Sequence, residues 1–299
     1  MVDPPRSRAL SGDLSGDGAR LTIPADLSAM LVLLRHGEST YIVEERFQGR
    51  ADPPLSPTGR HQAALTGARL ADPSAPPSLP IPVGPAVEIA HSPLERARAT
   101  AAAVADATEE RHDPVPPLRP EPDLIEISQG DWEGLTRAEV EARDLEVLLA
   151  WRRDATTAEA PGGERVVDAA VRARAGVERA IAHLRDATEP DPDALRRSLV
   201  EGYLGSGGLR PWSLLVAHDG ILKLVLLALL DLPLDRFWSF PFGLCGITVV
   251  ELRAGRALLR THNRVDHLAP VEIAAEARAT GRPIAWDVAV VPDDRGGAL

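Results

Sequence analysis

Two apolar runs of strand length, far apart in the chain, each end in a histidine. Residues 30–34 lead into Arg35 and His36, and residues 212–217 lead into His218. A short, continuously apolar run is typical of a strand that is buried on both faces, as in a parallel sheet. In such sheets ligands bind beyond the carboxyl ends of the strands. We therefore expect both histidines at a functional edge of one sheet.

The rest of the chain alternates predicted strands with predicted helices. Ser56 followed by Pro57 marks a helix start, and Gly255 marks the turn of a final hairpin. This alternation predicts an α/β fold, a three-layer α/β/α sandwich with a mostly parallel central sheet. The predicted strands are 30–34, 86–90, 212–217, 247–252 and 257–261, and the predicted helices are 59–71, 94–107, 136–151, 164–185 and 221–230.

The length of 299 residues and the hydrophobic content of 44% allow one large domain or two small ones, and we expect one. We assign residues 1–28 to a flexible N-terminal tail, 29–268 to the domain, and 269–299 to a C-terminal extension. Residues 186–210 mix Pro, Asp and Gly, so we interpret them as a surface insertion.

The net charge of −11 argues against partners that attract basic surfaces, namely nucleic acid and anionic membranes. An anionic substrate must then meet a local basic pocket. Residues 1–18 lack the basic and apolar regions of a signal peptide, and the longest apolar run, 221–230, is about half of the roughly 20 residues that span a bilayer. Together with the single cysteine, Cys245, these features predict a cytoplasmic protein.

Arg35 and His36 are suited to phosphoryl chemistry. Removing a phosphoryl group without a metal requires a nucleophile, positive charge around the non-bridging oxygens, and an acid for the leaving oxygen. At a strand tip, Arg35 and His36 can converge with a second arginine and a second histidine on one phosphate. From this short motif alone, however, a charged strand end at the surface is equally plausible.

Further motifs follow in a fixed order and decide between these readings. They are Leu34–Glu38 with Arg46–Gly49, Asp52, Pro54–Ser56 and Gly59 after it, Ser92–Ala97, Leu124–Glu126 with Gly130–Gly134, and Val216–Gly220. In this order they resemble the histidine phosphatase superfamily, the phosphoglycerate mutase-like proteins, and within it the broad-specificity phosphatase branch. The resemblance covers about residues 30–268 and implies the phosphoglycerate mutase-like fold.

The resemblance also implies residue roles. His36 is the nucleophile that forms a covalent phosphohistidine, and Glu126 is the general acid, with Glu133 as its rival. The catalytic set that it implies is His36, Glu126, Arg35, Arg96 and His218. The substrate-binding set is Arg35, Ser39, Gln48, Gly49, Arg96, His218 and Asp219. No metal and no cofactor is implied.

Two positions depart from the family pattern. Tyr41-Ile42 stands where family phosphatases commonly have Trp-Asn, so an amide that often contacts the phosphate is missing. Asp219 stands where a glycine usually follows the second histidine, and its carboxylate would repel the phosphate unless it is turned away or paired with an arginine. The natural substrate stays open, because sugar phosphates, phosphoglycerate derivatives and nucleotides all remain compatible with the motifs.

The expected mechanism needs a neutral His36 whose second ring nitrogen donates a hydrogen bond, and we expect the acceptor in the backbone near Gly37. Glu126 protonates the leaving alcohol and then takes a proton from the hydrolytic water, so its pKa should be raised and the pH profile bell-shaped. We therefore expect a metal-independent phosphatase that acts on small phosphorylated metabolites. A homodimer is left open.

Three alternatives are less favoured. A cofactor-dependent phosphoglycerate mutase uses the same core residues, but the stretch from Trp132 to Glu164 resembles the phosphatase branch. A catalytically inactive member that binds phosphorylated ligands or a partner is disfavoured because all five core residues are retained together. A metal-dependent hydrolase is disfavoured because neither His-Glu-x-x-His nor clustered ligand spacing occurs.

Overall fold

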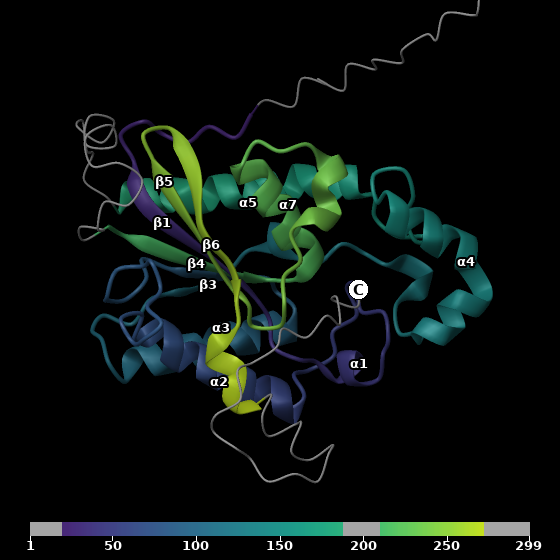
Figure 1. Cartoon of the computed structure of the whole chain (residues 1–299), viewed down its shortest axis with the longest axis horizontal. Coiled ribbons are helices and arrows are strands. Elements are labelled where there is room, and N and C mark those ends of the chain that lie inside the picture. The colour runs from purple at the N-terminus through teal and green to yellow at the C-terminus, as the bar shows by residue number, and fades with distance from the viewer. Residues whose placement is uncertain (1–19, 188–209, 272–299) are drawn as a thin grey trace, which may run out of the picture.

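The computed structural model describes residues 20–187 and 210–271, in which a six-stranded sheet lies between two layers of helices (Figure 1). The strand order is β3-β2-β4-β1-β5-β6, and the first four strands are mutually parallel. The hairpin of β5 and β6 continues the sheet antiparallel to β1. The strands are β1 (Ser28–Arg35), β2 (Ile89–His91), β3 (Leu118–Pro120), β4 (Trp212–Ala217), β5 (Ile247–Arg253) and β6 (Arg256–Arg264).

Helices cover both faces of the sheet, which confirms the predicted three-layer α/β/α arrangement. In Figure 1, α2 (Pro57–Ala71) and α3 (Glu95–Glu109) lie on one face, and α5 (Val166–Asp186) and α7 (Asp219–Leu229) lie on the other. The remaining helices are α1 (Thr40–Val43), α4 (Arg137–Arg153), and the short 3-10 helices η1 (Pro122–Leu124), η2 (Gly130–Trp132), η3 (Leu234–Ser239) and η4 (Asp266–Leu268).

The central strand β1 explains why its sequence is apolar without alternation. Successive side chains of a strand point to opposite faces, and both faces of β1 are covered. Leu31 and Leu33 join the core that includes α5 and α7, whereas Val32 and Leu34 join the core that includes α3. Each buried aliphatic side chain stabilises the fold by about 1.5–3 kcal/mol as an upper estimate. The strand is thus held from both sides up to Arg35.

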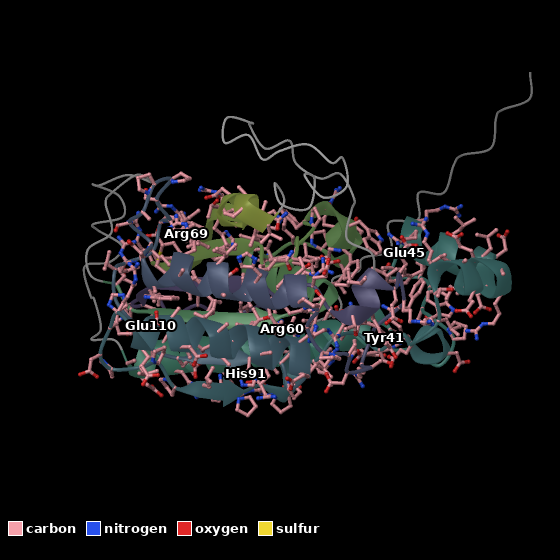
Figure 2. The ribbon with its side chains drawn as sticks, turned by 90° about the horizontal axis from the view of Figure 1, so that it is seen from below. Tyr41, Glu45, Arg60, Arg69, His91 and Glu110 are labelled. Carbon is pink, nitrogen blue, oxygen red and sulfur yellow. The ribbon has the colours of Figure 1, made fainter. Side chains whose placement is uncertain are left out.

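The helices of one face run from the site end of the molecule to its far end. Figure 2 shows Tyr41 and Glu45, in and after α1, at one end, and Arg69 and Glu110, at the ends of α2 and α3, at the other. The predicted start of α2 is confirmed, because the Ser56 hydroxyl accepts a hydrogen bond from the Gly59 amide at 2.9 Å. Both helices therefore begin near the carboxyl ends of the parallel strands.

Two strands differ from the sequence-based prediction. The strand predicted over 86–90 is found only at Ile89–His91, although the Val87 amide still donates to the Trp212 carbonyl at 2.7 Å. The edge strand β3 was not predicted, because prolines at 116, 117, 120 and 122 surround it. Proline cannot donate to a neighbouring strand, and an edge position tolerates it.

Some expectations concern residues that the structure does not describe. Three predicted segments lie for the most part outside the described residues, namely the tail over 1–28, the insertion over 186–210 and the extension over 269–299. Within residues 20–187 and 210–271, no helix combines the length and the apolar character that crossing a membrane requires.

Candidate active site

The carboxyl ends of three parallel strands meet at one edge and bring both predicted histidines together. The His36 amide donates to the Ala217 carbonyl at 3.0 Å, so the residues that follow β1 and β4 lie side by side. The rings of His36 and His218 pack edge to face, with centroids 5.0 Å apart and planes at 62°. Both side chains are buried. The expectation of one shared edge is confirmed.

The environment of His36 defines its tautomer. Its Nδ1 lies 2.6 Å from the Gly37 carbonyl oxygen, and a carbonyl can only accept, so Nδ1 carries the proton. Nε2 in turn accepts a hydrogen bond from Arg96 Nε at 3.2 Å. Burial, with the nearby charges of Arg96 and Arg35, holds the pKa of His36 well below its usual value. His36 is therefore neutral, with a lone pair on Nε2, as the sequence predicted.

The backbone after His36 is fixed by the start of α2. The Gly37 amide donates to Thr100 Oγ1 at 3.1 Å, and a Cβ on Gly37 would lie 2.6 Å from the Gly59 carbonyl oxygen. A Cβ on Gly59 would overlap the Glu38 carbonyl. The Glu38 carboxylate accepts the Ser56 hydroxyl at 2.5 Å. Helix and loop approach this closely only because both positions are glycine.

Two buried arginines flank the His36 ring. Arg35 Nη1 donates to the Phe242 carbonyl at 2.7 Å, and its buried Nε has no hydrogen-bond partner. Arg96 donates to the carbonyls of Gly49 at 2.9 Å and Ala51 at 2.8 Å, and burial lowers its pKa to about 10, which keeps it charged at neutral pH. Within residues 20–187 and 210–271, neither arginine forms an ion pair. Two buried cations that lack a direct ion-pair partner are costly unless an anion binds between them.

His218, whose ring packs against that of His36, also has a buried atom without a hydrogen-bond partner. Its Nε2 lies 2.7 Å from Ser92 Oγ, and its buried Nδ1 has no hydrogen-bond partner. The Leu94 amide donates to Ser92 Oγ at 3.4 Å, so the hydroxyl hydrogen is available for His218 Nε2. Burial lowers the pKa of His218 well below its usual value. This arrangement favours a neutral ring with the proton on Nδ1.

Glu126 lies where α7 begins. Its carboxylate accepts from the backbone amides of Ile127 at 2.9 Å, Ile221 at 3.0 Å and Gly220 at 3.2 Å. Burial nevertheless raises the pKa of Glu126, and the charge of Asp219 adds to this rise. The direction agrees with the expectation for a general acid.

The backbone of Glu126 is held by two arginines that the sequence analysis missed. Arg172 of α5 and Arg50 donate to the Glu126 carbonyl at 3.1 and 3.2 Å, and both bind the Glu164 carboxylate, at 2.7 and 3.1 Å. Arg172 also donates to the carbonyls of Asp123 and Ile125. These contacts join segments that are remote in sequence, so no local pattern indicated them.

The rival carboxylate, Glu133, is bound within its own loop. Its Oε1 accepts from the amides of Arg50 and Gln129, both at 2.9 Å, and from the Ser128 hydroxyl at 3.1 Å. The neighbouring Gly49 has a φ of +48°, and a Cβ there would overlap this carboxylate. Glu133 and Gly49 thus fix the loop that receives Arg96.

Ser39 and Gln48 are both buried and are joined by a hydrogen bond. Ser39 caps α1, where its hydroxyl accepts from the Ile42 amide at 3.3 Å and donates to Gln48 Oε1 at 2.6 Å. The Gln48 amide nitrogen makes no hydrogen bond with any described residue. A direct role of either side chain in substrate binding stays a prediction.

The carboxylate of Asp219 is paired, although with a lysine instead of the arginine that the sequence analysis considered. Its Oδ2 lies 2.5 Å from the Nζ of Lys223, the single lysine of the chain, and its Oδ1 accepts from the Phe242 amide at 3.0 Å. Lys223 Nζ also lies 4.7 Å from the ring centroid of Trp238. The i,i+4 spacing was the signal that could have found this pair.

The chain belongs to the histidine phosphatase superfamily, branch 1, whose family pattern matches residues 31–188 and 198–265. It is a phosphomonoester hydrolase. The resemblance inferred from the sequence motifs is thereby confirmed. In the described part of the chain, no three His, Cys, Asp or Glu residues are grouped so that they could hold a metal ion.

Its relatives include named phosphatases. Glucosyl-3-phosphoglycerate phosphatase from Mycolicibacterium vanbaalenii is 34% identical over 236 residues, which cover 79% of this chain and 86% of the relative. Phosphoserine phosphatase 1 from Hydrogenobacter thermophilus is 27% identical over 241 residues, covering 80% and 93%. Among solved structures, a mycobacterial glucosyl-3-phosphoglycerate phosphatase with inorganic phosphate superposes with a TM-score of 0.58 at 29% identity, covering 80% of this chain and 99% of that one.

Proposed function

We propose that this phosphatase works through a covalent phosphohistidine on Nε2 of His36. One observation carries the proposal: the neutral His36 ring, whose Nε2 bears a lone pair, lies beside two buried arginines. Neither Arg35 nor Arg96 forms an ion pair with any described residue. A phosphoryl group placed there supplies the anion that Arg35 and Arg96 lack. The unpartnered Nδ1 of His218 donates to a third oxygen.

In the first step, His36 Nε2 attacks phosphorus in line with the leaving oxygen. The N–P bond forms, the P–O bond breaks, and the leaving oxygen takes the proton of Glu126. In the second step, Glu126 removes a proton from water, the water oxygen attacks phosphorus, and the N–P bond breaks. Phosphate leaves, and His36 and Glu126 return to their starting protonation states.

Replacing His36 by alanine tests the nucleophile. The variant His36→Ala should lose turnover of p-nitrophenyl phosphate, and the acid-labile, base-stable label that a rapidly quenched native enzyme takes up from a phosphorylated substrate should disappear. His61→Ala is the matched control, because His61 is exposed on α2 and should change neither readout. Labelling that persists in His36→Ala would overturn the assignment.

We further propose that the substrate is a three-carbon acid phosphorylated at its terminal hydroxyl, or a glycoside of one. Support comes from the relatives, whose names specify glucosyl-3-phosphoglycerate and phosphoserine. Phosphate release from glucosyl-3-phosphoglycerate, phosphoserine and 3-phosphoglycerate should exceed release from nucleotides. Interconversion of 2- and 3-phosphoglycerate without phosphate release would identify the mutase alternative. A cytoplasmic location and a homodimer stay predictions.

A further inference from the structure

A short loop over 242–246, between η3 and β5, closes over the end of β1. The Cys245 amide donates to the carbonyl oxygens of Arg35 at 3.1 Å and His36 at 3.3 Å, which fixes the loop to the backbone of β1. From the same loop, the Phe242 carbonyl accepts a hydrogen bond from Arg35 Nη1 at 2.7 Å. The loop therefore holds both the backbone and the side chain of Arg35.

The bond to Phe242 is the single hydrogen bond that the Arg35 side chain makes with the described residues, although this side chain is buried. A long arginine side chain has several rotatable bonds, and the like charges of Arg35 and Arg96, which both act on the His36 ring, repel each other. Such a side chain keeps one geometry only if its acceptor is fixed. The position of the Phe242 carbonyl therefore decides where Arg35 meets the phosphoryl group.

The Phe242 carbonyl is held from both sides along the chain. On one side, the Phe242 amide donates to Asp219 Oδ1 at 3.0 Å. On the other, the Gly243 amide donates to Asn263 Oδ1 at 2.7 Å. The Gly243 N–H and the Phe242 C=O belong to one planar peptide unit, so fixing the first also fixes the second. Two side chains, Asp219 and Asn263, thus hold the group that receives Arg35.

Asp219 is held in turn by Lys223. Its second oxygen, Oδ2, lies 2.5 Å from Lys223 Nζ, and both side chains are buried. Hydrogen bonds that involve an ionised group are roughly twice as strong as those between neutral groups, so an ionised Asp219 is a firm anchor for the Phe242 amide. Lys223 supplies the counter-charge that allows this carboxylate to stay ionised while it is buried.

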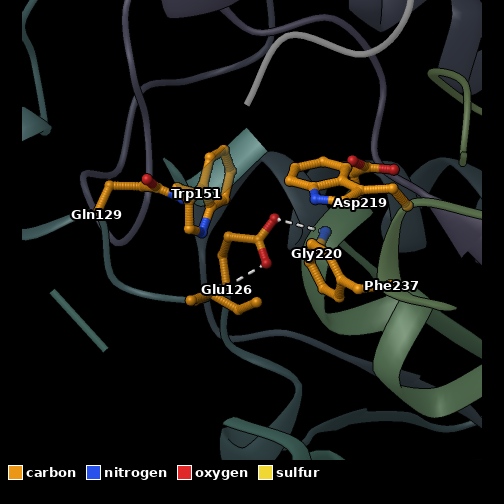
Figure 3. Close-up of a pocket in the computed structure, with 8 residues that line it drawn as sticks. Glu126, Gln129, Trp151, Asp219, Gly220 and Phe237 are labelled. Carbon is orange, nitrogen blue, oxygen red and sulfur yellow. Dashed lines mark hydrogen bonds between the residues drawn. The ribbon is translucent and has the colours of Figure 1, made fainter. Parts of the chain in front are cut away.

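Asp219 also lies in the part of α7 that binds the proposed general acid. Figure 3 shows the Glu126 carboxylate bonded to the amide of Gly220, the residue after Asp219, at 3.2 Å. The Ile221 amide bonds the same carboxylate at 3.0 Å. The first turn of α7 therefore holds Glu126 through its backbone and the loop that receives Arg35 through the Asp219 side chain.

We propose that Asp219, fixed by Lys223, is a positioning residue that places the Arg35 guanidinium for the phosphoryl group by holding Phe242. Asp219 acts through Phe242 and Arg35 and does not itself contact the phosphoryl group. The aspartate that departs from the family pattern thereby assists phosphate binding instead of opposing it. This inference rests on the proposed function, because the contact between Arg35 and the phosphoryl group is part of that function.

A double-mutant cycle tests whether Asp219 acts through Arg35. All variants carry Lys223→Met, so that no buried ammonium group is left without a partner. Asp219→Asn keeps an oxygen for the Phe242 amide, and Asp219→Ala removes it. With Arg35 present, we expect kcat/KM for p-nitrophenyl phosphate to be about tenfold lower with alanine than with asparagine. With Arg35→Ala, the two should agree within about twofold. Both variants lack the charge of Asp219, so its effect on Glu126 cancels in the comparison.

The outcomes are separable. A loss of equal size with and without Arg35 would show that Asp219 only stabilises the fold, and no loss with Arg35 present would show that Phe242 needs no anchor. Either result overturns the inference and leaves the proposed function intact. A smaller amount of folded enzyme would lower kcat/KM alike in both backgrounds and cannot imitate the coupling. If Arg35→Ala turns over too slowly, the affinity for inorganic phosphate, measured by titration calorimetry, closes the same cycle. A native kcat/KM in the single variant Arg35→Ala would overturn the role of Arg35 in the proposed function, and the inference with it.

Discussion

Replacing Lys223 by methionine should lower the free energy of unfolding by about 3–5 kcal/mol, the usual cost of removing one partner from a buried ion pair. The side chains of Lys223 and Asp219 are only 4% and 9% exposed, so water cannot compensate the carboxylate that is left. Methionine retains most of the apolar stem that packs near Phe237 and Trp238. The loss is large against a typical total stability of about 5–15 kcal/mol.

Urea unfolding followed by tryptophan fluorescence measures this change. The double variant Lys223→Met, Asp219→Asn has no unpaired charge and should recover at least about half of the loss. The KM for p-nitrophenyl phosphate should rise in Lys223→Met, because the uncompensated carboxylate repels the phosphate, and fall back in the double variant. A Lys223→Met variant within about 1 kcal/mol of the native stability would refute the reasoning, since it would mean that the carboxylate needs no counter-charge.

Further variants and the pH profile probe the rest of the site. Ser92→Ala should lower kcat about two- to tenfold, because it removes the hydrogen bond that fixes the His218 ring. Ser92→Thr keeps a hydroxyl and should be less affected. An unchanged kcat in Ser92→Ala would count against the proposed tautomer. The activity of the native enzyme should fall on the acid side only below the pH at which an ordinary histidine titrates, because the pKa of His36 is lowered. It should fall on the alkaline side only above the pH at which an ordinary carboxyl group titrates, because the pKa of Glu126 is raised. Glu126→Gln should lose the alkaline limb with p-nitrophenyl phosphate, whose good leaving group needs little acid assistance; a retained limb would assign it elsewhere. Gly59→Ala should cost about 1–3 kcal/mol in urea unfolding because its Cβ meets backbone, whereas Gly176→Ala, with contacts no closer than 3.4 Å, should not.

Much of the fold could be predicted because its causes are local. The apolar run of β1 reflects burial on both faces, and Ser56 with Pro57 supplies both the cap and the fixed backbone angle of a helix start. The strand β3 could not be predicted, since it has three residues among prolines and pairs only through its neighbour β2. The tautomer of His36 was predictable because its partner, Gly37, is the next residue.

The residues that hold the backbone of Glu126 were not predictable, for a different physical reason. Arg50, Glu164 and Arg172 come from a turn, a loop and a helix that are brought together only by the fold, and arginines are frequent along the whole chain. Nothing in the sequence separates these arginines from the exposed ones. The Asp219–Lys223 pair lies within one helix, yet its burial depends on aromatic residues that follow that helix.

The burial of Lys223 has a practical consequence for chemical labelling. It is the only lysine in the chain, and its ammonium group is enclosed and bonded to a carboxylate. Acylating reagents should therefore leave Lys223 unmodified as long as the protein is folded. Acylation of Lys223 would then report that the region around α7 had opened, and its rate would follow the unfolding of the enzyme without an engineered probe.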